Sequence, residues 1–230
     1  ASDDNTLRIT LTDNAKLNKD ITIDIGENES HYIRASGSTA DGSSIVLDGA
    51  GYDLTIRDDG EFNKKFIFGN NPTTNKLQIT KLGTLTINGA NVELAVQESK
   101  TKQSGVDIGA DRIVIENGAQ VNLNNNIANS GNHANTILRG LDMQITGADT
   151  EVNVGNTSLT GSNSTKNTKA VLGWQQFKNE DGTVDYAGSN IKISEATLNL
   201  HGVQVESSFG TQSYHPGYTA RVAGNSLTVD

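Results

Sequence analysis

The feature that most constrains this chain is a short triplet, an apolar residue, any residue and a second apolar residue, which returns throughout its length. Clear examples are Leu85-Thr-Ile87, Val121-Asn-Leu123 and Leu198-Asn-Leu200. Successive side chains of a β-strand point to opposite faces, so a period of two is typical of a strand with one buried face. We therefore expect an all-β protein built from many short strands.

The triplets also recur in a fixed order, which is the signature of a repeat architecture. One triplet is followed by a short gap with an Ala and then by a second triplet. The units are Leu85–Leu94, Ile113–Leu123, Met143–Val154 and Ile191–Leu200, with a weaker copy at Leu7-Arg-Ile9, Ala15 and Leu17. A third short strand ending in Gly precedes a unit or begins a new one: Phe66–Gly69, Val106–Gly109, Ile137–Gly140, Ala170–Gly173 and Ala220–Gly224. Three strands per repeat predict a right-handed parallel β-helix, a solenoid whose strands pair with equivalent strands above and below.

Such a solenoid has a core made of inward-facing columns, with glycine at the bends between faces and alanine at tight corners. One predicted column is Ile87, Ile115, Ile145 and Ile193, and a second is Leu94, Leu123, Val154 and Leu200. We treat residues 1–230 as one domain with loop insertions. Polar insertions fall mostly after the third strand of a unit: Gln97–Ser104, Asn124–Asn135, Asn156–Lys169, Gln175–Ser189 and Glu206–Thr219. An antiparallel β-sandwich is the alternative, but that fold does not explain why the same order of triplets recurs along the chain.

Charge and composition exclude several classes of partner. The chain has 18 basic and 27 acidic residues, a formal net charge of −9, and no cysteine. Binding to nucleic acid needs clustered Lys and Arg, so nucleic acid is not an expected partner. No apolar run approaches the length of a membrane-spanning helix, so we expect no membrane insertion by this segment. The absence of cysteine removes disulfides, thiolate nucleophiles and Cys-ligated zinc.

The unit resembles the passenger domain of bacterial autotransporters, the type V secreted surface proteins. The residues that carry the resemblance are Gly83–Leu94 and Arg112–Leu123, echoed at Met143–Val154 and Ile191–Leu200. The resemblance implies an exported, adhesin-like segment, and the leading hypothesis is that it is not an enzyme. It also implies a location at the bacterial cell surface or outside the cell, and anchorage through a C-terminal outer-membrane barrel. The start at Ala-Ser-Asp-Asp, with neither an initiator Met nor an apolar leader, is expected where a signal peptide has been removed or the chain has been cut. This chain contains no such barrel, and it looks like the N-terminal part of a longer passenger.

Catalytic and metal-binding motifs are not found in the sequence, and we predict no catalytic residue, no cofactor and no metal site. Neither a Gly-Asp-Ser-Gly nor a Gly-x-Ser-x-Gly stretch is present. The segment Asn179–Asp185 has carboxylates around a glycine but lacks the full calcium-loop pattern, which favours a turn. Carboxylates stacked on neighbouring strands leave open a carbohydrate-active β-helix, either a polysaccharide lyase or hydrolase or a tailspike-type depolymerase. The acidic residues concerned are Asp20, Asp24, Asp48, Asp53, Asp58 and Asp59, for which a solvated outer face is the simpler interpretation.

Aromatic residues gather in the two insertions near the C-terminus. Aromatic rings on projecting loops are typical of recognition surfaces. The predicted ligand-binding residues are Trp174, Tyr186, Tyr214 and Tyr218, with Asp181, Asp185 and Glu206 as acceptors for sugar hydroxyls or a basic protein. The same rings also fit a small hydrophobic cluster that keeps the loops folded. The partner of this patch would be a host surface protein or glycan.

Outward-facing amides suggest a second partner, another copy of the chain. Asn and Thr side chains on a flat face form hydrogen-bonded ladders with an identical surface. The predicted self-association residues are Asn122, Asn124, Asn126, Asn153 and Thr157. Cell aggregation and biofilm formation would follow from such contacts. A purely structural spacer in a long stalk is the third possibility.

Overall fold

The computed structural model describes residues 8–11, 15–25, 31–35, 43–58, 65–69, 74–96, 103–125, 133–155, 167–173, 175–178, 184–187, 189–201, 204–209, 219–224 and 226–230. All regular structure in these residues is β-strand, and no helix occurs among them. The expected all-β class is confirmed.

The described strands form two large sheets and one small pair. The seven-stranded sheet runs in the order β1 (Arg8–Leu11), β4 (His31–Ala35), β7 (Lys65–Gly69), β9 (Asn91–Val96), β11 (Gln120–Asn125), β13 (Glu151–Gly155) and β18 (Thr197–His201). The main path of the twelve-stranded sheet is β19 (Gln204–Phe209), β20 (Thr219–Gly224), β14 (Asn167–Leu172), β12 (His133–Thr146), β10 (Gln103–Glu116), β8 (Thr74–Asn88), β5 (Ser43–Asp48) and β2 (Ala15–Lys16). The same sheet includes β3 (Ile21–Ile25), β6 (Leu54–Asp58), β17 (Asn190–Ser194) and β21 (Ser226–Val229). Strands β15 (Gln175–Lys178) and β16 (Val184–Ala187) pair with each other antiparallel.

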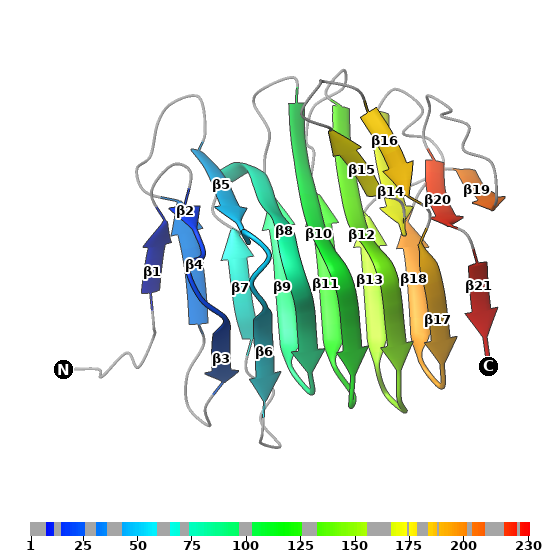
Figure 1. Ribbon diagram of the computed structural model, residues 1–230, viewed down its shortest axis with the longest axis horizontal. Helices are drawn as coiled ribbons and strands as arrows, with labels where there is room; N and C mark the ends of the chain where they lie inside the picture. Colours follow the sequence, from blue (N-terminus) through cyan, green and yellow to red (C-terminus); the bar gives the residue numbers. More distant parts are fainter. Residues whose placement is uncertain are drawn as a thin grey trace.

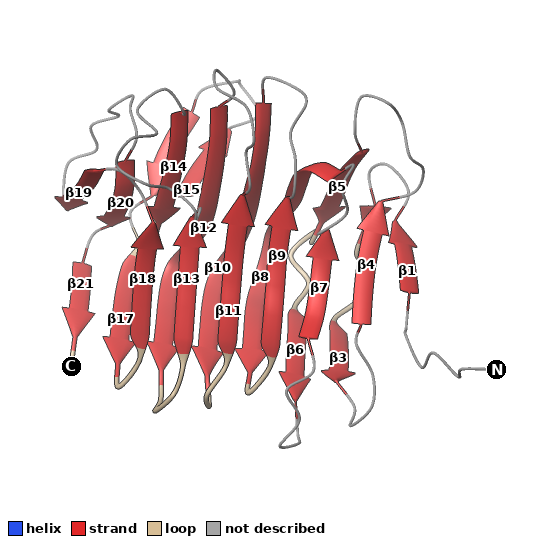
Figure 2. Ribbon diagram, turned by 180° about the vertical axis from the view of Figure 1, so that it is seen from behind, coloured by secondary structure: helices blue, strands red, loops and turns tan. Residues whose placement is uncertain are grey.

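All strand pairs in the two large sheets are parallel, for example β8 with β10 and β10 with β12. The chain alternates between the sheets, passing from β8 to β9, from β10 to β11 and from β12 to β13. Figures 1 and 2 show the sheets as two facing layers, with the strands of one layer running upward and those of the other downward. This arrangement is compatible with the expected solenoid.

The core lies between the two layers, and the predicted columns are confirmed. Ile115 is in register with Ile87 on one side and with Ile145 on the other, and Ile145 is in register with Ile193. The second column is formed in the same way, because Leu123 pairs with Leu94 and Val154, and Val154 pairs with Leu200. All members except Leu200 are buried, and Leu200 packs partly buried against the core.

A corner column joins the two sheets at the edge where the short turns lie. Ala90 and Ala119 are fully buried there, and the next position is taken by Thr150, followed by Ala196. The backbone carbonyls of Ala90, Ala119 and Thr150 each accept a hydrogen bond from the following strand. The sequence pattern predicts an alanine at this corner in every unit, and for the unit Met143–Val154, where that alanine is Ala148, the prediction is wrong. The turn there is three residues long, 147–149, and places Ala148 on the surface.

Three strands per repeat is not what the structure shows for the central repeats. The predicted Gly-ended strand and the following triplet form one long strand in β10 and in β12, and the triplet Leu85–Ile87 likewise belongs to a long strand, β8. Phe66–Gly69 was placed in the wrong sheet, because β7 is the counterpart of β9, with Phe66 opposite Val92 and Phe68 opposite Leu94. Leu7–Ile9 is likewise no counterpart of Leu85–Ile87, because the described part of it, in β1, pairs with β4.

The predicted insertions are attached to the sheets at two different places. The segments between β9 and β10, β11 and β12, and β13 and β14 all leave from the same end of the seven-stranded sheet, as expected. The insertion at 174–188 instead separates β14 from β17 within the twelve-stranded sheet, and it contains the β15–β16 pair. Glu206 does not lie in a loop, because it belongs to β19 opposite Arg221 of β20.

The 174–188 insertion begins after Gly173, next to a row of residues on neighbouring strands of the twelve-stranded sheet that consists of Gly49, Leu82, Ala110 and Gly140. Leu82 lies opposite Ala110, and Ala110 opposite Gly140. A Cβ atom on Gly49 would come within 2.7 Å of the Leu82 backbone, so no larger residue fits there without a shift. Buried Ser189 follows Gly140, and its hydroxyl lies against the carbonyl oxygens of Gly140 and Gly173, which ties the two ends of the insertion together.

Candidate functional site

The outer face of the seven-stranded sheet carries a row of hydrogen-bonded polar side chains, which we call the amide ladder: Asn122, Glu151, Asn153, Asn199 and His201. Asn122, Asn153 and Asn199 occupy equivalent positions on β11, β13 and β18 because each is the middle residue of an apolar-x-apolar triplet. Their apolar neighbours point inward, so the amides point outward.

The ladder is continuous across three strands. Asn153 Nδ2 donates to Asn122 Oδ1 at 3.0 Å, and Asn199 Nδ2 donates to Asn153 Oδ1 at 2.9 Å. Glu151 Oε1 accepts from the same two amides, at 3.0 Å from Asn153 and 3.1 Å from Asn199. His201 Nε2 lies 3.3 Å from Asn153 Oδ1. Both amide protons of Asn153 are therefore used within the chain.

An array of this kind presents fixed amide and carboxylate groups at the spacing of parallel strands, about 4.8 Å. Because the ladder holds its side chains in place, a partner does not need to order them on binding. Hydroxyl, amide or ammonium groups of a partner are the chemical match for such a face. The ladder offers a row of polar groups on the outer face of the sheet as a contact surface.

The predicted self-association residues fall in three groups. Asn122 and Asn153 are brought together as expected, but they bond to each other within one chain. Asn124 lies in β11, and Asn126 and Thr157 lie outside the described residues. Sequence reasoning missed Asn199, Glu151 and His201. The signal for Asn199 was present, since Leu198-Asn-Leu200 repeats the pattern of Val152-Asn-Val154.

The predicted aromatic patch lies mainly outside the described residues. This holds for Trp174, Asp181, Tyr214 and Tyr218. Tyr186 and Asp185 belong to β16, with their backbones opposite Gln176 and Phe177. The β15–β16 pair lies near the upper end of β12 and β14 in Figure 1, and β15 contacts β12. The expectation that β14 and β20 occupy adjacent places is confirmed, with Ala170 opposite Ala220.

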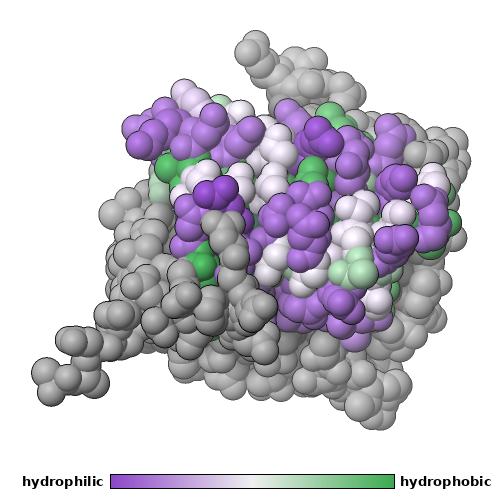
Figure 3. Space-filling model, turned by 90° about the horizontal axis from the view of Figure 1, so that it is seen from below, coloured by the Kyte–Doolittle hydropathy of each residue, from purple (hydrophilic) through white to green (hydrophobic). Residues whose placement is uncertain are grey.

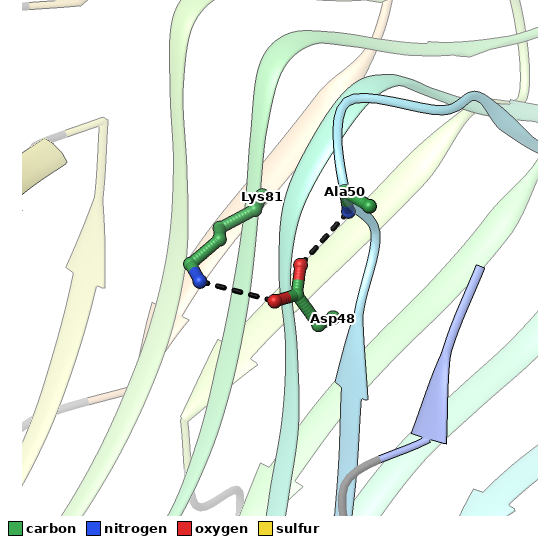
Figure 4. Close-up of polar contacts among 3 residues, drawn as sticks. All are labelled: Asp48, Ala50 and Lys81. Carbon is green, nitrogen blue, oxygen red and sulfur yellow. Dashed lines mark hydrogen bonds and ion pairs between the residues drawn. The ribbon is translucent and has the colours of Figure 1, made fainter. Parts of the chain in front are cut away.

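The stacked carboxylates have structural partners. Asp48 accepts a hydrogen bond from the backbone N–H of Ala50 at 2.8 Å and from Lys81 Nζ at 3.0 Å (Figure 4). Burial on its own raises the pKa of Asp48, but these donors, together with the charges of Lys81 and Lys16, outweigh it and the pKa lies below its usual value. A hydrogen bond from Arg57 likewise lowers the pKa of Asp24 below its usual value.

A second pair of carboxylates bonds to the backbone of the next strand. Asp20 Oδ1 accepts from the N–H of Asp53 at 3.0 Å, and Asp53 Oδ1 accepts from the N–H of Thr84 at 2.7 Å. Asp58 ends β6, and Asp59 lies outside the described residues. Asp20, Asp24, Asp48 and Asp53 thus connect neighbouring strands, which is the role expected of a polar outer face.

The five ion pairs seen among described side chains share this arrangement. Four of them join neighbouring strands of the twelve-stranded sheet: Arg57–Asp24, Lys81–Asp48, Arg112–Asp142 and Arg139–Asp107. The fifth joins Lys192 of β17 to Asp230, the residue that directly follows β21. The most buried is Arg139–Asp107, with side chains 16% and 25% exposed and two contacts of 2.8 and 2.9 Å. Its two parallel contacts give it the bidentate geometry that makes such pairs strong.

Nothing in the described part of the chain gathers three or more His, Cys, Asp or Glu residues that could hold a metal ion. Nor do the described residues include a helix long and apolar enough to cross a membrane. Comparison with protein-family models, with curated proteins and with solved structures finds no match to this chain.

Proposed function

We propose that this chain is a segment of an exported, adhesin-like bacterial surface protein, built as a right-handed parallel β-helix of the autotransporter passenger type. The parallel order of both large sheets, the strict register of the inward columns and the alternation of the chain between layers support the solenoid. In this proposal the segment is not an enzyme and acts by displaying its outer faces to a partner. Its location would be the bacterial cell surface, through a C-terminal barrel, or the medium.

The amide ladder is the observation that carries the proposed binding role. Its side chains are aligned along the stack and held by one another, which favours contact with a second extended surface over capture of a small ligand. Another copy of the chain offers such a surface. A host glycan or surface protein, bound by the ladder or by the segments 174–188 and 210–218, is the other partner class within the proposal.

A matched pair of triple variants tests the role of the ladder in self-association. Asn122, Asn153 and Asn199 are changed together to Lys in the full chain, which moves the formal net charge from −9 to −9 + 3 = −6. The control variant changes Thr55, Thr86 and Gln144 to Lys, which alters the charge equally on the outer face of the other sheet. Sedimentation velocity and settling of cells that display the protein measure association.

We expect the ladder variant to associate at least about tenfold more weakly than the control, because like charges would meet across the interface. Thermal unfolding of both variants is measured in parallel. Equal association of the two folded variants would overturn the proposal that the ladder is the contact face.

The carbohydrate-active alternative has its own test. The purified chain is incubated with a panel of acidic and neutral polysaccharides, and reducing ends and unsaturated sugars are measured. Release of either product would overturn the non-enzymatic proposal. The export route is tested separately: the gene should continue into a barrel of alternating strands, each about ten residues long.

A further inference from the structure

Two Asn–Gly dipeptides occur in the sequence, Asn88-Gly89 and Asn117-Gly118, and both lie at short turns between the two large sheets. Glycine has no side chain to shield its backbone nitrogen and restricts the preceding peptide least. The nitrogen that follows an Asn is therefore well placed to react with the side-chain carbonyl carbon when the turn permits it.

The Asn117-Gly118 turn is a tight one. Asn117 has φ +58° and Gly118 has φ +76°, and the N–H of Ala119 donates to the carbonyl of Glu116 at 3.3 Å. These φ signs are those of a type I′ turn, which favours Asn-Gly. Asn117 is exposed, and the described residues of this edge are mainly hydrophilic (Figure 3). Water reaches the turn.

The two glycine nitrogens are held differently. The N–H of Gly118 donates to the Thr150 hydroxyl oxygen at 2.9 Å, and that hydroxyl donates in turn to the carbonyl of Thr146 at 2.9 Å. The N–H of Gly89 donates to the backbone carbonyl of Glu116 at 3.0 Å. One buried side chain therefore holds Gly118 in place, whereas the main chain of the neighbouring turn holds Gly89.

We propose that Asn117 is a self-modification site whose rate is set by the Thr150 hydroxyl. The Gly118 nitrogen gives up its proton and forms a bond to Cγ of Asn117, while the Cγ–Nδ2 bond breaks and Nδ2 leaves as ammonia. Water then opens the resulting succinimide at one of its two carbonyls, which gives aspartate or isoaspartate. No oxidant or reductant is involved. The hydrogen bond from the Gly118 N–H to the Thr150 hydroxyl holds this nitrogen in place and must break before the nitrogen attacks Cγ, so it slows the reaction.

The product alters contacts between neighbouring turns. Asn117 Nδ2 donates to Asn88 Oδ1 at 3.1 Å, and Asn88 Nδ2 donates to Glu116 Oε1 at 2.9 Å. Modification removes the first donor and adds a carboxylate beside Glu116, and isoaspartate also lengthens the main chain of the turn by one carbon. The modification therefore weakens the attachment of this turn to β8, whatever partner the outer faces bind.

The test compares Thr150→Val, which removes the acceptor with little change of shape, and Thr150→Ser, which keeps it. The full chain is incubated at neutral pH, and conversion at each Asn–Gly pair is followed by peptide mapping and mass spectrometry. In the Val variant we expect Asn117 to convert about fivefold faster, a factor that corresponds to about 1 kcal/mol. Conversion in the Ser variant should match that of the parent chain.

Asn88 is the internal control for unfolding. Its rate should not change in either variant, and in the denatured chain both sites should convert at similar rates. Equal acceleration of Asn88 and Asn117 in the Val variant would overturn the proposal, because it would mean that global unfolding controls the reaction. An unchanged Asn117 rate in that variant would overturn it as well.

Discussion

Asp48 illustrates at the scale of a residue how an outer-face carboxylate contributes to this fold. Its bonds to Ala50 and Lys81 lower its pKa below the ordinary value of 3.8. A carboxyl whose pKa is lowered in the folded state stabilises that state above the unfolded pKa, and this contribution is lost as the pH falls through the folded pKa. We expect Asp48→Asn to lower the free energy of unfolding by about 0.5–1 kcal/mol at neutral pH, and to have almost no effect once the pH is well below 3.8.

Urea unfolding of the parent and the variant across this pH range measures the difference. Lys81→Gln and the double variant complete a cycle that isolates the ion pair from the bond to Ala50. A difference between parent and Asp48→Asn that stays constant down to the lowest pH would contradict the assignment.

Strand β10 shows the alternation on which each element depends. Ile115 is fully buried between Ile87 and Ile145, whereas the adjacent Val114 faces outward and is half-buried. Ile115→Asp should cost several kcal/mol, because it buries an unpaired carboxyl group, and Val114→Asp should cost less than about 1 kcal/mol. Chemical denaturation of both variants provides the comparison. Similar losses in the two would mean that β10 does not have one buried and one outer face.

The molecule as a whole is a stack in which each strand pairs only with its neighbours, and this predicts a gradient of local stability. Ile115 in the centre of the stack is fully buried, whereas Val229 at the C-terminal end is 67% exposed although it is in register with the same column. Amide hydrogen exchange should be slowest in β10 and β12 and fastest in β21. Uniform protection along the stack would indicate one all-or-none folding unit.

Local pattern was enough to predict the all-β class and the register of the two inward columns. The reason is that inward and outward positions alternate strictly along a strand, so one slip would expose the whole apolar set. The same pattern placed Asn122 and Asn153 on one face. It also contained Asn199, whose triplet Leu198-Asn-Leu200 is the equivalent one on β18.

Only the tertiary structure decided which residues meet across turns of different length. The turns before Ala90, Ala119 and Thr150 contain one, two and three residues. The corner position is therefore an alanine in two units and Thr150 in the third, although the flanking triplets follow the same pattern in all three. The assignment of Phe66–Gly69 to the seven-stranded sheet likewise depends on pairing with Val92 and Leu94, far along the chain. The alternation of apolar and polar residues indicates which face of a strand is buried. It does not indicate which sheet the strand joins, because that depends on contacts between residues far apart in the sequence.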